Sequence, residues 1–147
     1  MQGHIRDAVP ADLPHVHEMM GLLAQHHGED RSISLTDLQA QVSRHRARIL
    51  VAAEAEGLVG YALILTRPNL VTGGEAHDIN HLFVVEWRRR AGIGRALIAA
   101  AREVCRSAGA EMLVIGTHWA NLGAQSAYRD MGLEEVQYGP RFLVPLA

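Results

Sequence analysis

The stretch WRRRAGIGRALIAAAREVC, from Trp87 to Cys105, decides the fold of this chain. Three consecutive arginines run from Arg88 to Arg90, Gly92 and Gly94 follow, and an apolar helical pattern begins at once. Because glycine has no Cβ, it adopts positive φ readily and lets a ligand approach the main chain closely. The stretch therefore predicts a tight turn that connects a strand to a helix.

The helix predicted after this turn presents one apolar stripe, formed by Leu97, Ala101, Val104 and Ala108, and Gly109 ends it. A helix N-terminus carries unpaired N–H groups and about half a positive charge, and arginine adds donors that suit phosphate oxygens. The turn is thus a candidate phosphate site. A Walker A loop is absent, and Leu97 stands where a dinucleotide fingerprint needs its third glycine. The alternative is a surface turn with a solvated basic patch.

A second group of polar positions lies in ANLGAQSAYRDMGL, residues 120–133. Asn121, Ala124 and Tyr128 fall at i, i+3 and i+7, so they share one face of a predicted helix. A small residue between two polar ones suits a groove that holds a ligand. The alternative is that Asn121 only caps the helix and Tyr128 is a core tyrosine with its hydroxyl at the rim.

The rest of the chain predicts an α/β (α+β) protein. Helices are expected at 13–27, where Asp12 caps, and at 35–46, where Ser34 or Thr36 caps. Strands are expected at 4–9, 47–54, 58–66, 77–85, 111–118, 134–138 and 141–146. Strands first follow one another and then alternate with helices, which is typical of a sheet covered by helices. At 147 residues and 48% hydrophobic content, we expect one domain spanning 1–147.

Composition excludes several classes of protein. A formal net charge of -2 argues against a general nucleic-acid binder. Cys105 is the only cysteine, and the nine histidines lack the spacing of a metal site, so neither a disulfide nor a metal is expected. The N-terminus carries Arg6, Asp7 and Asp12 where a signal peptide is apolar, and no apolar run approaches about 20 residues. We therefore expect a cytoplasmic protein without a membrane partner.

Together, the two motifs resemble those of the GNAT superfamily of acetyl-CoA-dependent N-acetyltransferases. Its phosphate motif, Arg/Gln-x-x-Gly-x-Gly/Ala, matches Arg89-Arg90-Ala91-Gly92-Ile93-Gly94. Its second motif, Asn-x-x-Ala-x-x-x-Tyr-x-x-x-Gly-Phe, matches Asn121, Ala124, Tyr128 and Gly132, with Leu133 in place of the final aromatic residue. The resemblance is specific from Ile79 to Leu133 and looser elsewhere. It implies a mixed, mainly antiparallel central sheet of six to seven strands with about four helices. Two parallel central strands, HLFVV and EMLVIG, would splay apart as a V.

The resemblance also implies how acetyl-CoA lies. The pantetheine arm would pair with the backbone of Leu82, Phe83 and Val84. The pyrophosphate would rest on the backbone amides of the turn, which belong to Arg89, Arg90, Ala91, Gly92, Ile93, Gly94 and Arg95. Asn121, with Ala124 on the same helix face, would contact the pantetheine, and Tyr128 would point at the thioester sulfur.

The implied activity is N-acetyl transfer from acetyl-CoA to a primary amine of a small molecule or peptide, by direct attack in a ternary complex and without a metal. Tyr128, with an ordinary pKa of about 10, would protonate the leaving thiolate. The alternative is a non-catalytic acyl-CoA-binding or regulatory domain of the same fold. The identity of the acceptor stays open, as does the choice between monomer and homodimer.

Two residues compete for the role of general base. On a regular strand, Asp78, Asn80 and Leu82 would share one face, with His77, Ile79 and His81 on the other. Some family members that acetylate proteins carry a catalytic glutamate at the position of Asp78, which is our first choice. Some that acetylate polyamines carry one at the position of Asn80, but an asparagine cannot act as a base. His81 is second, because an ordinary histidine pKa of about 6.5 suits the task.

Overall fold

The computed structural model describes residues 4–29, 32–137 and 139–147. The chain divides into two compact units, Met1–Gly116 and Thr117–Ala147, and the first contains the whole sheet. The single domain over 1–147 stays a prediction.

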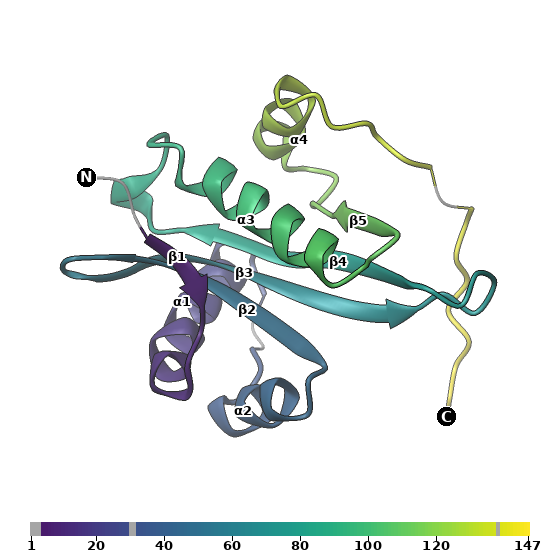
Figure 1. Cartoon of the computed structure of the whole chain (residues 1–147), viewed down its shortest axis with the longest axis horizontal. Helices are drawn as coiled ribbons and strands as arrows, with labels where there is room; N and C mark the ends of the chain where they lie inside the picture. Colours follow the sequence, from purple (N-terminus) through teal and green to yellow (C-terminus); the bar gives the residue numbers. More distant parts are fainter. Residues whose placement is uncertain (1–3, 30–31, 138) are drawn as a thin grey trace. The chain divides into compact units, whose positions relative to one another are not determined.

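The sheet has five strands in the order β1-β2-β3-β4-β5 (Figure 1). They are β1 (His4–Asp7), β2 (Ala47–Glu54), β3 (Gly57–Pro68), β4 (Glu75–Val84) and β5 (Met112–Ile115). The first four strands pair antiparallel, and β5 pairs with β4 in parallel. The predicted α/β class and the mixed, mainly antiparallel sheet are confirmed.

The strand count is lower than the six to seven predicted. Residues 134–137 and 141–146 form no strand, while Tyr138 lies outside the described residues, and β5 is only four residues long. Phe142 and Leu143 are 85% and 96% exposed. Apolar and β-branched residues give a segment the propensity for a strand, but only a neighbouring strand satisfies its backbone groups, and these segments have none.

Helices cover both faces of the sheet in the first unit. α1 (Leu13–His26) and α2 (Leu35–Ser43) lie on one side and α3 (Ile93–Ser107) on the other (Figure 1). Ser34 caps α2, because its Oγ accepts a hydrogen bond from the N–H of Asp37 at 3.1 Å. Short 3-10 turns, η1 (Pro10–Asp12) and η2 (Glu86–Arg88), precede α1 and α3. The second unit contains α4 (Leu122–Asp130).

The helix α3 approaches the sheet closely at Gly60 of β3. A Cβ atom on Gly60 would lie 2.7 Å from the carbonyl oxygen of Phe83 and 3.4 Å from Cδ1 of Leu97. Because the nearer atom belongs to the backbone of the neighbouring strand, it cannot rotate away. Only glycine lets β3, β4 and α3 meet at this distance.

Replacing Gly60 with alanine is expected to lower the free energy of unfolding by about 1–3 kcal/mol, because the added methyl group overpacks this contact. Gly21, inside α1, has no heavy atom within 4 Å of the corresponding Cβ position. Gly21→Ala is therefore the control, and it is expected to raise stability by about 0.5–1 kcal/mol. Urea unfolding of both variants measures the difference. Equal stability of Gly60→Ala and the wild type would contradict this account of the packing.

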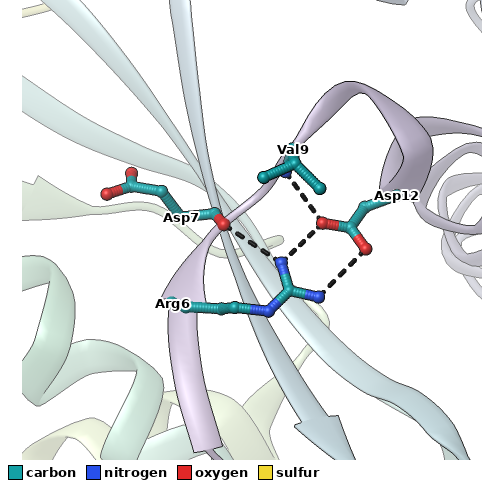
Figure 2. Close-up of polar contacts among 4 residues, drawn as sticks. All are labelled: Arg6, Asp7, Val9 and Asp12. Atoms are coloured by element: carbon teal, nitrogen blue, oxygen red, sulfur yellow. Dashed lines mark hydrogen bonds and ion pairs between the residues drawn. The ribbon is translucent and has the colours of Figure 1, made fainter.

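Asp12 closes the turn between β1 and α1 (Figure 2). Its Oδ2 accepts hydrogen bonds from the N–H of Val9 at 2.8 Å and from Nη1 of Arg6 at 2.6 Å, and its Oδ1 accepts from Nη2 of Arg6 at 3.1 Å. Asp12 is the N-cap residue of α1, as predicted, but its side chain makes no capping hydrogen bond to this helix. A capping residue normally has an extended backbone, whereas Asp12 has helical angles of φ -79° and ψ -24°, and its carboxylate turns back toward Arg6.

The hydrogen bond from Arg6 holds the pKa of Asp12 below its ordinary value, although burial opposes this shift. The ionised carboxylate therefore stabilises the fold above the unfolded-state pKa of about 3.9, and this stabilisation disappears as the pH falls through the lower folded-state pKa. Asp12→Asn is expected to lower the free energy of unfolding at pH 7. At about pH 2 the variant and the wild type are expected to have the same free energy of unfolding. Chemical denaturation between pH 7 and about pH 2 tests this. A stability difference that does not change with pH would contradict it.

Candidate active site

The strands β4 and β5 separate halfway along β4. Their parallel pairing joins Ala76–Ile79 to Met112–Ile115, and β4 then continues alone on this side to Val84. The register between β3 and β4 shifts at the same point, which leaves Asn80 without a partner on β3. Because a bulge bends a strand and sharpens its twist, Asn80 explains why the two strands part here.

The end of β4 turns backbone groups toward the side that β5 has left. The N–H of Val85 donates to the carbonyl of Val59 on β3 at 2.9 Å. Backbone groups alternate along a strand, so the N–H and C=O of Val84 and Leu82 point the other way. Of the three β4 residues predicted to pair with the pantetheine, Leu82 and Val84 therefore present their backbone to this edge, where the carbonyl of Val84 accepts a hydrogen bond from Nε of Arg89. Phe83 directs its backbone toward β3.

The arginine-glycine turn is open and lies against the end of β4. Arg90 and Gly92 have φ values of 64° and 85°, and α3 begins at Ile93. The N–H groups of the first helical turn, including those of Gly94 and Arg95, have no acceptor within the helix. A Cβ on Gly92 would meet nothing within 4 Å, and a Cβ on Gly94 would lie 3.9 Å from Cγ2 of Val84.

The four arginines of this turn have different roles. Arg88 binds Glu54 through two hydrogen bonds of 2.7 and 2.8 Å. Arg89 donates from Nε to the carbonyl of Val84 at 2.8 Å, and its guanidinium lies 5.6 Å from the centre of the Phe83 ring. Within the described ranges, the side chains of Arg90 and Arg95 have no hydrogen bond or ion pair. These two guanidinium groups are therefore available to an anion.

The bulge at Asn80 also changes which residues share a face of β4. Asp78 pairs with Leu65 and His81 with Leu63, so both lie on the same side of the sheet. Ile79 pairs with Ile64 and therefore lies on the opposite side from His81. The prediction that Asp78 and His81 occupy opposite faces is wrong, because it assumed a regular strand.

The two candidate bases have different surroundings. The Asp78 side chain is 20% exposed, and its Oδ2 lies 3.9 Å from Nη2 of Arg67. His81 lies with Nδ1 3.1 Å from Oη of Tyr61. Burial lowers the pKa of His81, Glu29 raises it and His27 lowers it further. His81 is therefore neutral at pH 7, while the carboxylate of Asp78 lies beside a cation.

Sequence reasoning missed Tyr61 altogether. It lies in the apolar run LVGYALILT, which predicts a core strand and nothing more. The phenol is completely buried, and burial raises the pKa of Tyr61. Only the register between β3 and β4 brings it to His81, so no local signal could have found this pair.

The second unit holds the other predicted residues. Asn121 caps α4, because its Oδ1 accepts a hydrogen bond from the N–H of Ala124 at 3.0 Å. Tyr128 is half-buried on this helix, and burial raises the pKa of its phenol. The contacts of Asn121 and Ala124 with pantetheine and of Tyr128 with the thioester sulfur stay predictions.

Cys105 is buried, as predicted, with its Sγ 3.0 Å from Nδ1 of His77. Nε2 of His77 in turn lies 3.2 Å from Oε2 of Glu75.

Among the residues with described positions, no group of three or more His, Cys, Asp or Glu side chains could hold a metal ion. No helix in that part of the chain has the length and apolar character needed to cross a membrane.

Comparison with known proteins identifies the family of this chain. The sequence profile of the acetyltransferase (GNAT) family matches residues 16–133. The chain is 32% identical to the uncharacterized N-acetyltransferase YhfO of Bacillus subtilis (strain 168) over 98 residues. These residues are 67% of this chain and 66% of YhfO, so the match spans just under two thirds of YhfO. It is 29% identical to the aminoglycoside N(6')-acetyltransferase type 1 of Stenotrophomonas maltophilia, over 97% of this chain and 93% of that protein.

Solved structures show the same fold. A probable acetyltransferase superposes with a TM-score of 0.83 at 20% identity, with 98% of each chain covered. An aminoglycoside acetyltransferase from an uncultured soil metagenomic sample, in complex with trehalose, gives the same TM-score and identity over 98% of this chain and 96% of that one. The predicted fold and the predicted acyltransferase class are both confirmed. The matched residues 16–133 include both the arginine-glycine turn and the asparagine-tyrosine helix, and this chain belongs to the acetyltransferase (GNAT) family.

Proposed function

We propose that this chain transfers the acetyl group of acetyl-CoA to a primary amine of a small molecule or peptide, by direct attack in a ternary complex. One observation carries the proposal: the edge of β4 that no longer pairs with β5, at Leu82 and Val84, meets the open N-terminus of α3 at Gly94. The helix end, with Arg90 and Arg95, suits a diphosphate. The strand edge suits the amide groups of an extended pantetheine arm.

The chain's own residues account for the steps that such a transfer needs. Acetyl-CoA supplies the acyl group as an activated thioester. An alkyl ammonium has a pKa of about 10.4, so the amine must lose a proton before it attacks, and Asp78 or His81 accepts that proton directly or through water. Backbone N–H groups at the free edge of β4 stabilise the developing oxyanion. Tyr128 protonates the departing thiolate, whose thiol has an ordinary pKa of about 8.5.

We infer that a polycationic amine is the acceptor to test first. The carboxylate of Asp78 lies on the same face of β4 as His81, and Glu29 is close enough to His81 to raise its pKa. Two carboxylates near one amine site favour a substrate with more than one positive charge. The relative named as an aminoglycoside N(6')-acetyltransferase gives a further reason to begin with aminoglycosides.

A thiol-release assay with acetyl-CoA tests the function across aminoglycosides, polyamines, amino acids, arylamines and peptides. Release of thiol is expected with one of these classes of amine and not without an acceptor. Calorimetry is expected to show binding of acetyl-CoA and not of ATP or NAD. Tight binding of acetyl-CoA with no turnover of any amine would indicate the non-catalytic alternative. Binding of ATP or NAD alone would overturn the proposal.

Tyr128→Phe tests the role of the phenol separately. It is expected to leave the Kd of acetyl-CoA within about twofold of the wild type and to lower kcat by about a hundredfold, because only proton transfer to the thiolate is lost. Calorimetry and steady-state kinetics on the same preparation measure both quantities. An unchanged kcat would remove Tyr128 from the mechanism.

A further inference from the structure

The phenol of Tyr61 has one hydrogen-bond partner among the residues that the structure describes. The Tyr61 side chain is completely buried, and its Oη lies 3.1 Å from Nδ1 of His81. Across the described part of the chain, this is the only hydrogen bond of that hydroxyl group. A buried O–H group without an acceptor is unfavourable, so the phenol hydrogen must point at Nδ1.

This direction of donation decides where the imidazole carries its own hydrogen. Burial raises the pKa of Tyr61 and lowers that of His81, so at neutral pH both groups are uncharged. A neutral imidazole has one N–H group and one acceptor nitrogen. Since Nδ1 accepts from Tyr61, the hydrogen lies on Nε2. The opposite tautomer would leave the buried phenol hydrogen without a partner.

The accessible edge of His81 is the edge that carries Nε2. The rings of Tyr61 and His81 meet edge to face, with their centres 6.0 Å apart at 72°. Nδ1 faces the buried phenol, so Nε2 points away from it, and His81 is half-exposed where Tyr61 is not. Glu29, His27 and Asp78 are the titratable groups that act on His81 or share its face of β4.

We propose that Tyr61 is a positioning residue that holds His81 as the neutral tautomer with its hydrogen on Nε2. His81 then donates a hydrogen bond from Nε2 to an oxygen atom of the acceptor molecule and does not act as the base. The carboxylate of Asp78, on the same face, remains as the proton acceptor. The catalytic part of this inference rests on the proposed acetyl transfer, whereas the tautomer itself does not.

Nuclear magnetic resonance of protein labelled with ¹⁵N-histidine tests the tautomer without any activity measurement. In the free wild-type protein above the pKa of His81, Nδ1 is expected to show the chemical shift of an acceptor nitrogen and Nε2 that of an N–H group. The signals are assigned by their loss in His81→Gln. In Tyr61→Phe, Nδ1 loses its hydrogen-bond donor, so the share of the tautomer with its hydrogen on Nδ1 is expected to rise. A wild-type hydrogen on Nδ1 would overturn the proposal.

A pair of substitutions at position 81 tests the role in turnover. Glutamine places an amide N–H group close to the position of Nε2, whereas alanine offers no donor. His81→Gln is expected to keep kcat/KM within about tenfold of the wild type, and His81→Ala to lose about a further tenfold. Equal losses of about a hundredfold or more in both would make His81 the base and overturn the proposal.

The same pair in a Tyr61→Phe background gives the matched control, because no buried phenol is then left without its acceptor. In this background too, the variant with glutamine at position 81 is expected to be more active than the variant with alanine. A higher activity of the alanine variant would contradict a donor role. If no amine is turned over at all, the proposed function fails, and the resonance measurement alone decides the tautomer.

Discussion

Asp78→Asn is expected to lower kcat/KM with the preferred amine by at least about a hundredfold. Asparagine keeps the size of the side chain but cannot accept the proton that the ammonium must lose. The Kd of acetyl-CoA is expected to change by less than about twofold, because Asp78 lies where β4 still pairs with β5, before the free edge begins. Steady-state kinetics and calorimetry measure the two quantities.

Two control variants separate proton transfer from the nearby ion pair. Arg67→Gln removes the cation 3.9 Å from Asp78 and leaves the carboxylate in place. Since the Arg67 side chain is 59% exposed, kcat/KM is expected to stay within about threefold of the wild type. Asp78→Glu retains a carboxylate and is expected to keep more activity than Asp78→Asn. Full turnover by Asp78→Asn, together with loss of activity in His81→Ala, would assign the base to His81 instead.

Gly94→Asp is expected to weaken acetyl-CoA binding by about a hundredfold while leaving the fold intact. A Cβ at position 94 would meet only Cγ2 of Val84, at the ordinary contact distance of 3.9 Å. A carboxylate in the first turn of α3 is favourable for the helix itself. However, two negative charges about 4 Å apart near a protein surface repel by about 4 kcal/mol, so a diphosphate would be rejected.

Gly94→Asn is the matched control for this substitution, because it adds nearly the same bulk without the charge. We expect it to weaken binding by about tenfold or less and to show little dependence on salt. In Gly94→Asp the loss should shrink as the ionic strength rises, since mobile ions screen the repulsion. Calorimetry at two salt concentrations measures this. Equal affinities of the two variants would show that no phosphate group lies at this turn.

Much of the site was predictable because it depends on neighbours along the chain. Gly92 has a φ of 85°, as the turn before α3 requires, and Gly109 and Gly132 end their helices with φ of 79° and 80°. Asn121 caps α4 through Ala124, three residues on. Capping and turn geometry involve atoms within about four positions of one another, so the order of residues is enough to specify them.

Other parts of the site depend on residues that are far apart in the sequence. Arg88 is held by Glu54, 34 positions away, and His81 by Tyr61, 20 positions away. The pattern of apolar residues around Arg88 or around His81 does not indicate such a distant partner. The roles of the arginines and the state of the imidazole therefore could not be predicted from local pattern.

The sequence by itself determined the family, the turn that suits a phosphate and the helices that begin and end at Ser34, Gly92 and Gly109, because these follow from chemistry within a few residues. Only the tertiary structure decided that Asp78 and His81 share a face and that Tyr61 holds the imidazole. The physical reason is the unpaired residue Asn80, which shifts the register of β4 against β3 and so turns every later side chain to the other side of the sheet.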